Sequence, residues 1–254
     1  MAHRTFRDLP EILAPGDLVV LNDTKVSALR VRGAKVTGAA IEALLLRPVG
    51  QGRYLTMLRP GRRLRVGSRI VFERGVQATV EQVEGDGLSV LGFDSGNVEE
   101  MLLQIGTTPL PPYIKTGSPE PGRYQTVYAA KAGSAAAPTA GLHFTTDLLQ
   151  SLTDAGIGIA RVTLDVGLDT FRPLQAVDGH VMHGERCELP PETAAAVADC
   201  RGRVFAVGTT TVRTLESFAT GPRRLSWGEQ TTKLFIKPGF GFRAVDGMLT
   251  NFHM

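Results

Sequence analysis

Cysteine is scarce in this sequence: only Cys187 and Cys200 are present, and they do not form a Cys-x-x-Cys pair. Two separated cysteines provide no disulfide framework, so a reducing compartment fits best. Long apolar runs are missing as well. No segment reaches the length of a membrane span, and no basic start precedes an apolar stretch of the kind that directs secretion. We therefore expect a cytoplasmic protein without a membrane partner.

Several catalytic signatures are also missing. No Gly-x-Ser-x-Gly, P-loop or Gly-x-Gly-x-x-Gly motif occurs in a suitable setting, so the sequence gives no support to a serine hydrolase, a P-loop enzyme or a Rossmann enzyme. The segment Glu-Gly-Asp-Gly (84–87) lies between two strand-like stretches with no helix after it. It therefore predicts a hairpin and not a nucleotide-binding loop.

One pair of histidines leaves a metal site as an alternative. His180 and His183 are followed closely by Glu185 and Cys187, and all four residue types bind metals. The cluster lacks the His-Glu-x-x-His and paired Cys-x-x-Cys frames of zinc sites. We expect no metal, and we keep a metal-dependent hydrolase that uses His180 and His183 as an alternative.

The segments that are present fall into two kinds. With 254 residues, 43% of them hydrophobic and 21% charged, the chain is long enough for one large domain or two smaller ones. Between residues 26 and 95, short strand-like pieces alternate with turns, which predicts an inserted antiparallel barrel or sandwich. Residues 1–25 and 96–254 combine apolar strands with amphipathic helices, as in a mixed α/β domain.

Positive charge is concentrated in one part of the predicted insertion. The net charge is only +3, although a sequence pI near 9.0 permits an acidic partner. Residues 58–69 contain five arginines and no acidic residue, and alternation around Leu64 and Val66 places Arg63 and Arg65 on one face of a predicted strand. Such a patch is either a solvated strand face or a phosphate-binding surface.

Polar residues follow two predicted strands. The apolar run Leu18–Leu21 leads into Asn22, Asp23, Thr24 and Lys25. A second run, 203–207, leads into Gly208 and three threonines before a helix predicted over 212–219. Hydroxyls and unpaired N–H groups at a helix start can bind an anion, although ordinary threonine capping explains the same pattern equally well.

A third polar junction lies in the segment 136–149. Its small-residue loop contains Pro138 and Gly141 and ends at His143 and Phe144. An amphipathic helix follows, for which Thr145 or Thr146 is the expected N-cap. A histidine beside a glycine-containing turn and a helix start is suited to binding a polar or anionic ligand, whereas a loop that simply packs before a capped helix is the simpler interpretation.

These segments together resemble the S-adenosylmethionine:tRNA ribosyltransferase-isomerase family of queuosine biosynthesis. The similarity extends over nearly the whole chain in the family's order, and two of its motifs are long and unusual. The matching motifs are LNDTKV (21–26), LPPYI (110–114), RYQTVYA (123–129), APTAGLHF (137–144), VTLDVGLDTFRP (162–173), HVMHGE (180–185), AVGTTTVRTLES (206–217), KPGF (237–240) and TNFH (250–253).

The resemblance implies an α/β main domain with an inserted small antiparallel β-barrel, which we assign to residues 1–25 plus 96–254 and to residues 26–95. It implies that S-adenosylmethionine is a ribosyl-donating substrate. The ribosyl unit is transferred and isomerised onto 7-aminomethyl-7-deazaguanine at the tRNA wobble position, which gives epoxyqueuosine and releases adenine and methionine. The implied partner is a tRNA carrying that base, with a monomer as the working expectation. A truncated or degenerate relative that binds tRNA without catalysis is the competing interpretation.

The resemblance also suggests site residues. His143 is the first candidate for the catalytic base, followed by His183 and Asp165; the family commonly has histidine at the position of Asp165. Arg59, Arg62, Arg63 and Arg65 are expected to contact tRNA phosphates. The candidate substrate-binding residues are those of the matched motifs: Asn22, Thr24, Lys25, Thr139, Gly141, Phe144, Thr209, Thr210, Thr211, Arg213, Asn251 and His253.

Overall fold

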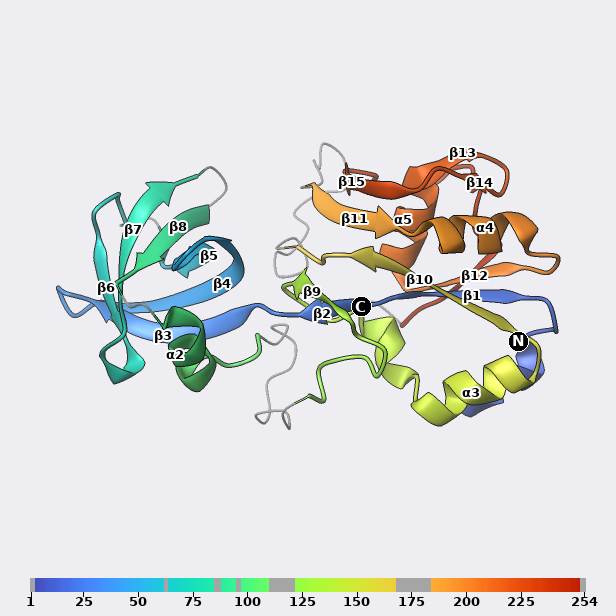
Figure 1. The fold of residues 1–254 in the computed structure, drawn as a ribbon, viewed down its shortest axis with the longest axis horizontal. Helices are drawn as coiled ribbons and strands as arrows, with labels where there is room; N and C mark the ends of the chain where they lie inside the picture. The colour runs from blue at the N-terminus through green and yellow to red at the C-terminus, as the bar shows by residue number, and fades with distance from the viewer. Residues whose placement is uncertain are drawn as a thin grey trace. The chain divides into compact units, whose positions relative to one another are not determined.

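The computed structural model describes residues 3–61, 64–84, 88–94, 97–109, 122–167 and 184–251. Its contacts divide the chain into two compact units (Figure 1). The first consists of Met1–Lys25, Lys115–Ala132 and Ala137–Met254, and the second of Val26–Ile114 and Gly133–Ala136. One unit contains a closed barrel and the other a mixed sheet with helices, so the predicted fold class is confirmed.

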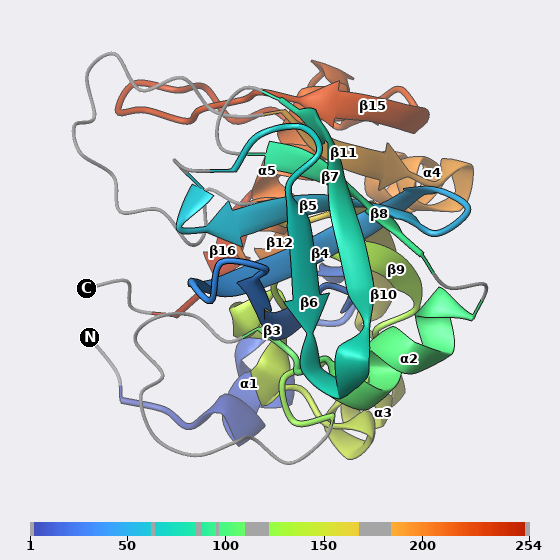
Figure 2. The same ribbon diagram turned by 90° about the vertical axis from the view of Figure 1, so that its left-hand side faces the viewer.

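The second unit is a six-stranded barrel in which every neighbouring pair of strands is antiparallel. The strands close in the order β3-β4-β5-β8-β7-β6, and Figure 2 shows β6 and β7 from the front. All six were predicted, because alternating apolar residues and turn residues mark each one. They are β3 (Leu29–Lys35), β4 (Ala40–Gly50), β5 (Arg53–Arg59), β6 (Arg69–Phe72), β7 (Gln77–Val83) and β8 (Leu88–Phe93).

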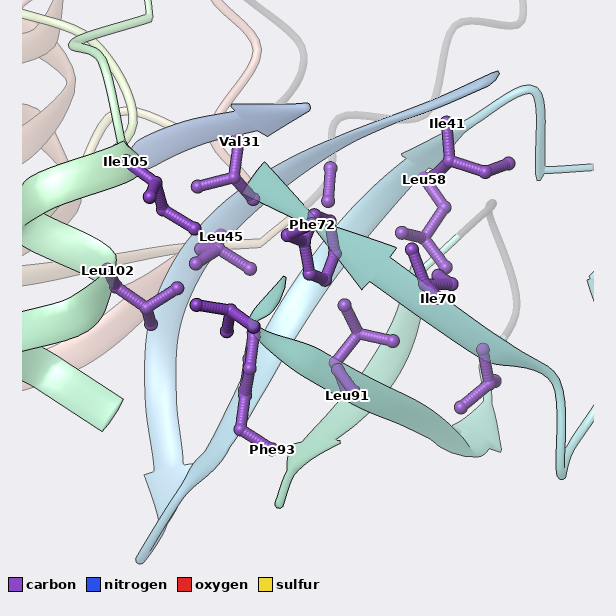
Figure 3. Packing of buried hydrophobic residues seen from close by; sticks show 14 of the residues in the cluster. Val31, Ile41, Leu45, Leu58, Ile70, Phe72, Leu91, Phe93, Leu102 and Ile105 are labelled. Carbon is purple, nitrogen blue, oxygen red and sulfur yellow. The ribbon is translucent and has the colours of Figure 1, made fainter. Parts of the chain in front are cut away.

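A single hydrophobic cluster fills the barrel (Figure 3). Leu45, Ile70 and Leu91 are among its buried side chains and come from three different strands. Helix α2 (Val98–Ile105) packs into the same cluster through Leu102 and Ile105, which lie on one face of the helix. The predicted domain boundaries place this helix in the main domain, whereas its apolar face contributes to the core of the barrel unit.

The first unit is built on a six-stranded sheet of order β15-β11-β10-β1-β12-β16. The strands β10, β1, β12 and β16 are parallel, and β11 is antiparallel to both of its neighbours. Their bounds are β1 (Leu18–Asn22), β10 (Gly158–Leu164), β11 (Glu185–Leu189), β12 (Val204–Val207), β15 (Gly228–Thr232) and β16 (Gly247–Leu249). Two short ladders pair β2 (Thr24–Val26) with β9 (Lys131–Ser134) and β13 (Ala219–Gly221) with β14 (Arg224–Leu225).

Alternate side chains of β1 point to the two faces of this sheet. Val19 and Leu21 pack with α1 (Leu9–Ile12) and α3 (Thr146–Asp154) on one face. On the other face Asn22 bonds to α5 (Thr209–Phe218), which also packs against β10 and β12. The other helical segments among the described residues are α4 (Pro191–Asp199), which packs on β10, the 3₁₀ turns at Phe6–Asp8 and Thr139–His143, and the 3₁₀ turn Glu73–Gly75 of the barrel unit. Among the described helices, none has the length and apolar character needed to cross a membrane.

Candidate active site at the strand ends

The carboxyl ends of β1, β10 and β12 bring the predicted polar junctions of the first unit to one edge of its sheet. The chain forms β10 on one side of β1 and β12 on the other, so the direction of strand addition reverses around β1. In α/β sheets, ligands bind outside the carboxyl ends of strands at such a reversal. The sequence predicts both strands and the polar residues after them. It does not predict that β1 and β12 pair, because the two strands are far apart in the chain.

Asn22 connects three elements at this edge. Its Nδ2 donates to Leu164 O (3.1 Å) and to Thr210 Oγ1 (3.2 Å). Its Oδ1 accepts from the backbone N–H groups of Thr24 (3.2 Å) and Leu164 (3.0 Å). An amide side chain has two donor hydrogens and two acceptor lone pairs, so this buried residue makes all of its hydrogen bonds within the protein. Asn22 therefore positions the strand ends.

Asp165 follows β10 and has a partner at each carboxylate oxygen. Thr24 Oγ1 donates to Oδ1 over 2.9 Å, and Arg186 Nη1 donates to Oδ2 over 3.2 Å. Arg186 also forms a bidentate pair with Glu229, with bonds of 2.8 and 2.9 Å. These contacts hold Asp165 in one orientation. Lys25, next to the buried Thr24, is exposed.

Asp23 is a further polar residue at this edge, and it is not among the predicted substrate-binding residues. Its side chain is buried, and Oδ1 accepts from Thr163 Oγ1 over 2.7 Å. Its backbone carbonyl accepts from the N–H groups of Ala130 and Lys131. The motif LNDTKV already contains this residue, and its position directly after a buried strand is the signal that could have included it.

Helix α5 begins at Thr209, three residues before the predicted start. Gly208 is the N-cap residue, with φ of +82°, which a glycine adopts without strain. Thr210 Oγ1 accepts from Asn22, and Thr211 Oγ1 donates to the carbonyl of Val207 over 2.6 Å. These two hydroxyls bond elsewhere and do not cap the helix. The first N–H groups of the helix have no acceptor within it, and the side chain of Thr209 is exposed beside them.

Arg213 of α5 and Glu185, the first residue of β11, form a buried ion pair. Their side chains are 13% and 5% exposed, and Arg213 Nη1 donates to Glu185 Oε2. Glu185 Oε1 accepts from the N–H of Gly167 over 2.7 Å, and Arg213 Nε donates to the carbonyl of Leu234 over 3.0 Å. Arg213 Nη2 is buried and has no hydrogen-bond partner among the described residues.

His143 ends the 3₁₀ turn Thr139–His143, which replaces the predicted loop. Its side chain is exposed, and its Nε2 lies 2.9 Å from Asn251 Oδ1, a contact that orients the ring. The ring of Phe6 lies 5.3 Å away. Phe144 is buried and packs against Phe6 and Tyr128 with ring centroids 5.0 and 6.2 Å apart. Of these two neighbours in the sequence, His143 is the one that is accessible.

Two motifs meet at Gly141. A side chain at this position would collide with the hydroxyl of Tyr128 and contact Thr126, so only glycine fits without a shift. The hydroxyls of Tyr128 and Thr126 are buried and have no hydrogen-bond partner among the described residues. Burial, together with the charge of Asp23, raises the pKa of Tyr128, which keeps this phenol neutral.

Several predicted residues lie outside the described part of the chain: Arg62, Arg63, His180, His183 and His253. Within the described ranges, no group of three or more histidine, cysteine, aspartate or glutamate residues is arranged to hold a metal ion. Burial raises the pKa of the Cys187 thiol to about 11, so this residue stays protonated near neutral pH.

Arg59 and Arg65 are exposed on the barrel unit. The predicted strand around Leu64 and Val66 is wrong for the residues that the structure describes. Leu64 is buried, but Arg65 begins a turn in which the N–H of Ser68 donates to its carbonyl over 2.9 Å. The Ser68 hydroxyl accepts in return from the Arg65 N–H over 3.0 Å. This side-chain bond to the backbone favours a turn over a strand.

Buried polar contacts at the reversal point of a parallel sheet define an α/β protein with an enzyme-like site. The comparisons with known proteins give its family: residues 1–254 match the family described as "Queuosine biosynthesis protein". The chain therefore belongs to the queuosine biosynthesis protein family.

Similar proteins carry a more specific name. The S-adenosylmethionine:tRNA ribosyltransferase-isomerase of Moorella thermoacetica is 49% identical over 263 residues, which cover 100% of this chain and 77% of that protein. The protein of the same name from Symbiobacterium thermophilum is 48% identical over 260 residues, which cover 99% and 76%. A crystal structure of S-adenosylmethionine tRNA ribosyltransferase from Thermotoga maritima is 32% identical and has a TM-score of 0.45, covering 100% of this chain and 73% of that one.

Proposed function

We propose that this protein is an S-adenosylmethionine:tRNA ribosyltransferase-isomerase. It transfers and isomerises the ribosyl unit of S-adenosylmethionine onto 7-aminomethyl-7-deazaguanine at the tRNA wobble position, gives epoxyqueuosine, and releases adenine and methionine. The observation that carries this proposal is the 48–49% identity to proteins of that name over essentially the whole chain. A hydrolase built on His180 and His183 has no comparable support.

The reaction requires a base near the sulfonium centre. The positive sulfur makes the adjacent C5′ protons acidic, and a positioned side chain removes one of them. His143 is accessible and its ring is oriented by Asn251, whereas both oxygens of Asp165 accept hydrogen bonds from other side chains. We therefore assign the base to His143 and a positioning role to Asp165. His183 remains a candidate outside the described residues.

Other groups at the strand ends are suited to hold the substrate. The first N–H groups of α5 have no acceptor within the helix and favour an anion, and the buried Nη2 of Arg213, which has no partner among the described residues, is suited to donate to a carboxylate. We assign the methionine carboxylate to Arg213 and to the N–H groups of Thr209–Thr211. Thr139 and Gly141 form the turn that carries His143. Lys25 lies on the accessible side of β2 and is assigned to the substrate as well.

We assign tRNA phosphate contacts to the barrel arginines, of which Arg59 and Arg65 are exposed. We also propose that the protein acts in the cytoplasm as a monomer. Arginine side chains at an accessible surface donate to phosphate without reading the base sequence, so they supply affinity and not specificity. Recognition of the wobble base falls to the strand-end site.

The function is tested by following adenine released from S-adenosylmethionine. Release should require tRNA that carries the deazaguanine amine, and it should persist after exhaustive chelation because no step uses a metal. tRNA binding without any adenine release would favour the non-catalytic relative. Loss of activity on chelation, restored by zinc, would favour the hydrolase.

The role of His143 is tested by single-turnover kinetics. His143→Ala should slow the step about 10²–10⁴-fold, the usual contribution of a positioned proton acceptor, and leave tRNA affinity nearly unchanged. His3→Ala is the control variant, since His3 is an exposed histidine that belongs to none of the matched motifs. An unchanged rate in His143→Ala would move the base to another residue.

A further inference from the structure

The segment between β15 and β16 has an unusual composition. Residues 233–243 read KLFIKPGFGFR and contain three phenylalanines, two lysines and one arginine, with no acidic residue. Aromatic rings next to cations are the features that bind unpaired nucleotides, because bases stack on the rings and phosphates pair with the cations. A short apolar segment in a protein core would not carry these charges.

Of the three rings of this segment, that of Phe242 is exposed, and those of Phe235 and Phe240 are half-buried. Phe242 is 53% exposed, and its ring lies edge-on to that of Phe240, with centroids 5.1 Å apart. Lys237 Nζ lies 5.3 Å from the centre of the Phe235 ring. The N–H of Phe240 donates to the carbonyl of Lys237 over 3.0 Å, and Gly239 supplies the positive φ of this turn. Lys233, Lys237 and Arg243 are all exposed.

Both ends of the segment are fixed to helix α5. Near its start, the carbonyl of Leu234 accepts from Arg213. At its end, the buried carboxylate of Glu216 accepts from the N–H groups of Arg243, Ala244 and Val245 over 3.0–3.2 Å. Charge-assisted bonds to backbone N–H groups are strong, so the aromatic turn is held in place before any ligand binds. Holding it in place lowers the entropy lost on binding.

The segment also begins at the edge of the sheet that carries the candidate active site. β15 is antiparallel to β11, and β11 is antiparallel to β10, so β15 runs in the direction of β10 and β1. Its last residue, Thr232, therefore lies at the edge where β1 and β10 end. Arg213, which holds Leu234, is the same residue that pairs with Glu185 in the site.

We propose that residues 233–243 bind single-stranded RNA, with unpaired bases of the anticodon loop stacking on Phe240 and Phe242 and with Lys237 and Arg243 contacting phosphates. The inference rests on the proposed function, which brings a wobble base to the strand ends. Bases that flank the wobble position in the loop then lie within reach of a surface that starts at the same edge. The three cations favour RNA over an apolar peptide as the occupant.

The experiment measures binding of a fluorescent, unmodified anticodon stem-loop RNA by anisotropy at several salt concentrations. Phe242→Ala should raise the Kd about 5- to 150-fold, the range that removal of one stacking ring produces. Lys237→Ala should reduce the slope of log K against log salt by about 0.7, the value for one contact to a single strand. Trp227→Ala is the matched control, because Trp227 is 66% exposed but precedes β15 at the other end of the strand.

The outcomes separate this surface from the enzyme's function. An equal loss in Trp227→Ala, or wild-type affinity in Phe242→Ala with an unchanged unfolding midpoint, overturns the surface while adenine release by the wild type still supports the function. A wild type that binds RNA through Phe242 but releases no adenine keeps the surface and overturns the function. A wild type that binds no RNA overturns the surface, and adenine release with the modified tRNA then decides the function separately.

Discussion

Asn22 and Thr210 join the end of β1 to the first turn of α5, with Asn22 Nδ2 donating to Thr210 Oγ1 over 3.2 Å. The same side chain makes three further bonds to β10 and Thr24. Asn22→Ala should lower the free energy of unfolding by about 2–4 kcal/mol, because it leaves several buried polar groups without partners. Denaturant titration measures the change. Gln150→Ala removes an exposed amide of α3 and should change stability by less than about 0.5 kcal/mol.

A second prediction concerns Gly141, which lies close to Tyr128. An alanine at position 141 would place its methyl group against the Tyr128 hydroxyl. Gly141→Ala should lower the unfolding free energy by about 1–3 kcal/mol and slow adenine release, since the turn that carries His143 must shift. Combining it with Tyr128→Phe removes the colliding oxygen and should restore part of both losses. Strictly additive effects in the double-mutant cycle would show that the two residues do not interact.

Tyr128→Phe alone gives a third, contrasting prediction. The hydroxyl is buried without a partner among the described residues, so its removal should leave stability unchanged or raise it slightly. Thermal unfolding monitored by circular dichroism provides the measurement. A loss of about 1 kcal/mol or more would mean that the hydroxyl makes a hydrogen bond after all.

The lowered pKa of Asp17 makes the free energy of unfolding depend on pH. Burial acts to raise the pKa of this carboxyl, but hydrogen bonds from the Arg203 guanidinium and from the N–H groups of Ala14 and Arg203 outweigh burial and lower the pKa from 3.8 to about 2. The folded state therefore holds its proton less tightly than the unfolded state. The stabilisation is complete above pH 3.8 and is lost as the pH falls towards 2.

Asp17→Asn should therefore be less stable than the wild type near neutral pH, and the difference should shrink as the pH falls from about 4 to about 2. Denaturant titrations at a series of pH values measure it. Asp154→Asn, at an exposed carboxylate of α3, should show no such convergence. A constant difference between Asp17→Asn and the wild type across this range would disprove the assignment.

The barrel arginines give a prediction about salt. If Arg59 and Arg65 each contact a tRNA phosphate, the double alanine variant should bind tRNA more weakly and reduce the slope of log K against log salt by about 0.7–0.9 per contact. Arg53→Ala is the control, because Arg53 pairs with Glu81 over 2.7 Å on the same unit. Normal binding by the double variant at every salt concentration would place the phosphate contacts elsewhere.

The sequence predicts local features of this protein better than distant pairings. The strands of the barrel and the bounds of α2 follow from apolar spacing and turn residues within a few positions. The start of α5 does not, because threonines have low helix propensity and the contact between Asn22 and Thr210 joins residues far apart in the chain.

Two further features of the structure differ from the predictions because they depend on contacts between residues far apart in the chain. Residues 220–230 carry the polar character of a loop, yet β15 begins at Gly228 because it pairs with β11, residue Leu189 opposite Gly228. The ion pair of Arg213 with Glu185 links a helix to a strand 28 positions earlier, and no spacing rule connects them. The motifs identify the residues, whereas tertiary contacts decide which ones are accessible.

The position of β1 in the middle of its sheet has a consequence for synthesis on the ribosome. β1 is made first, but its partners β10 and β12 begin only at Gly158 and Val204. The barrel strands and α2 are complete by Ile105, so the barrel can fold while β1 still has two unpaired edges. An unpaired apolar strand can pair with another chain. Folding of the barrel before β10 is made shortens the flexible chain that must close before β1 meets its partners.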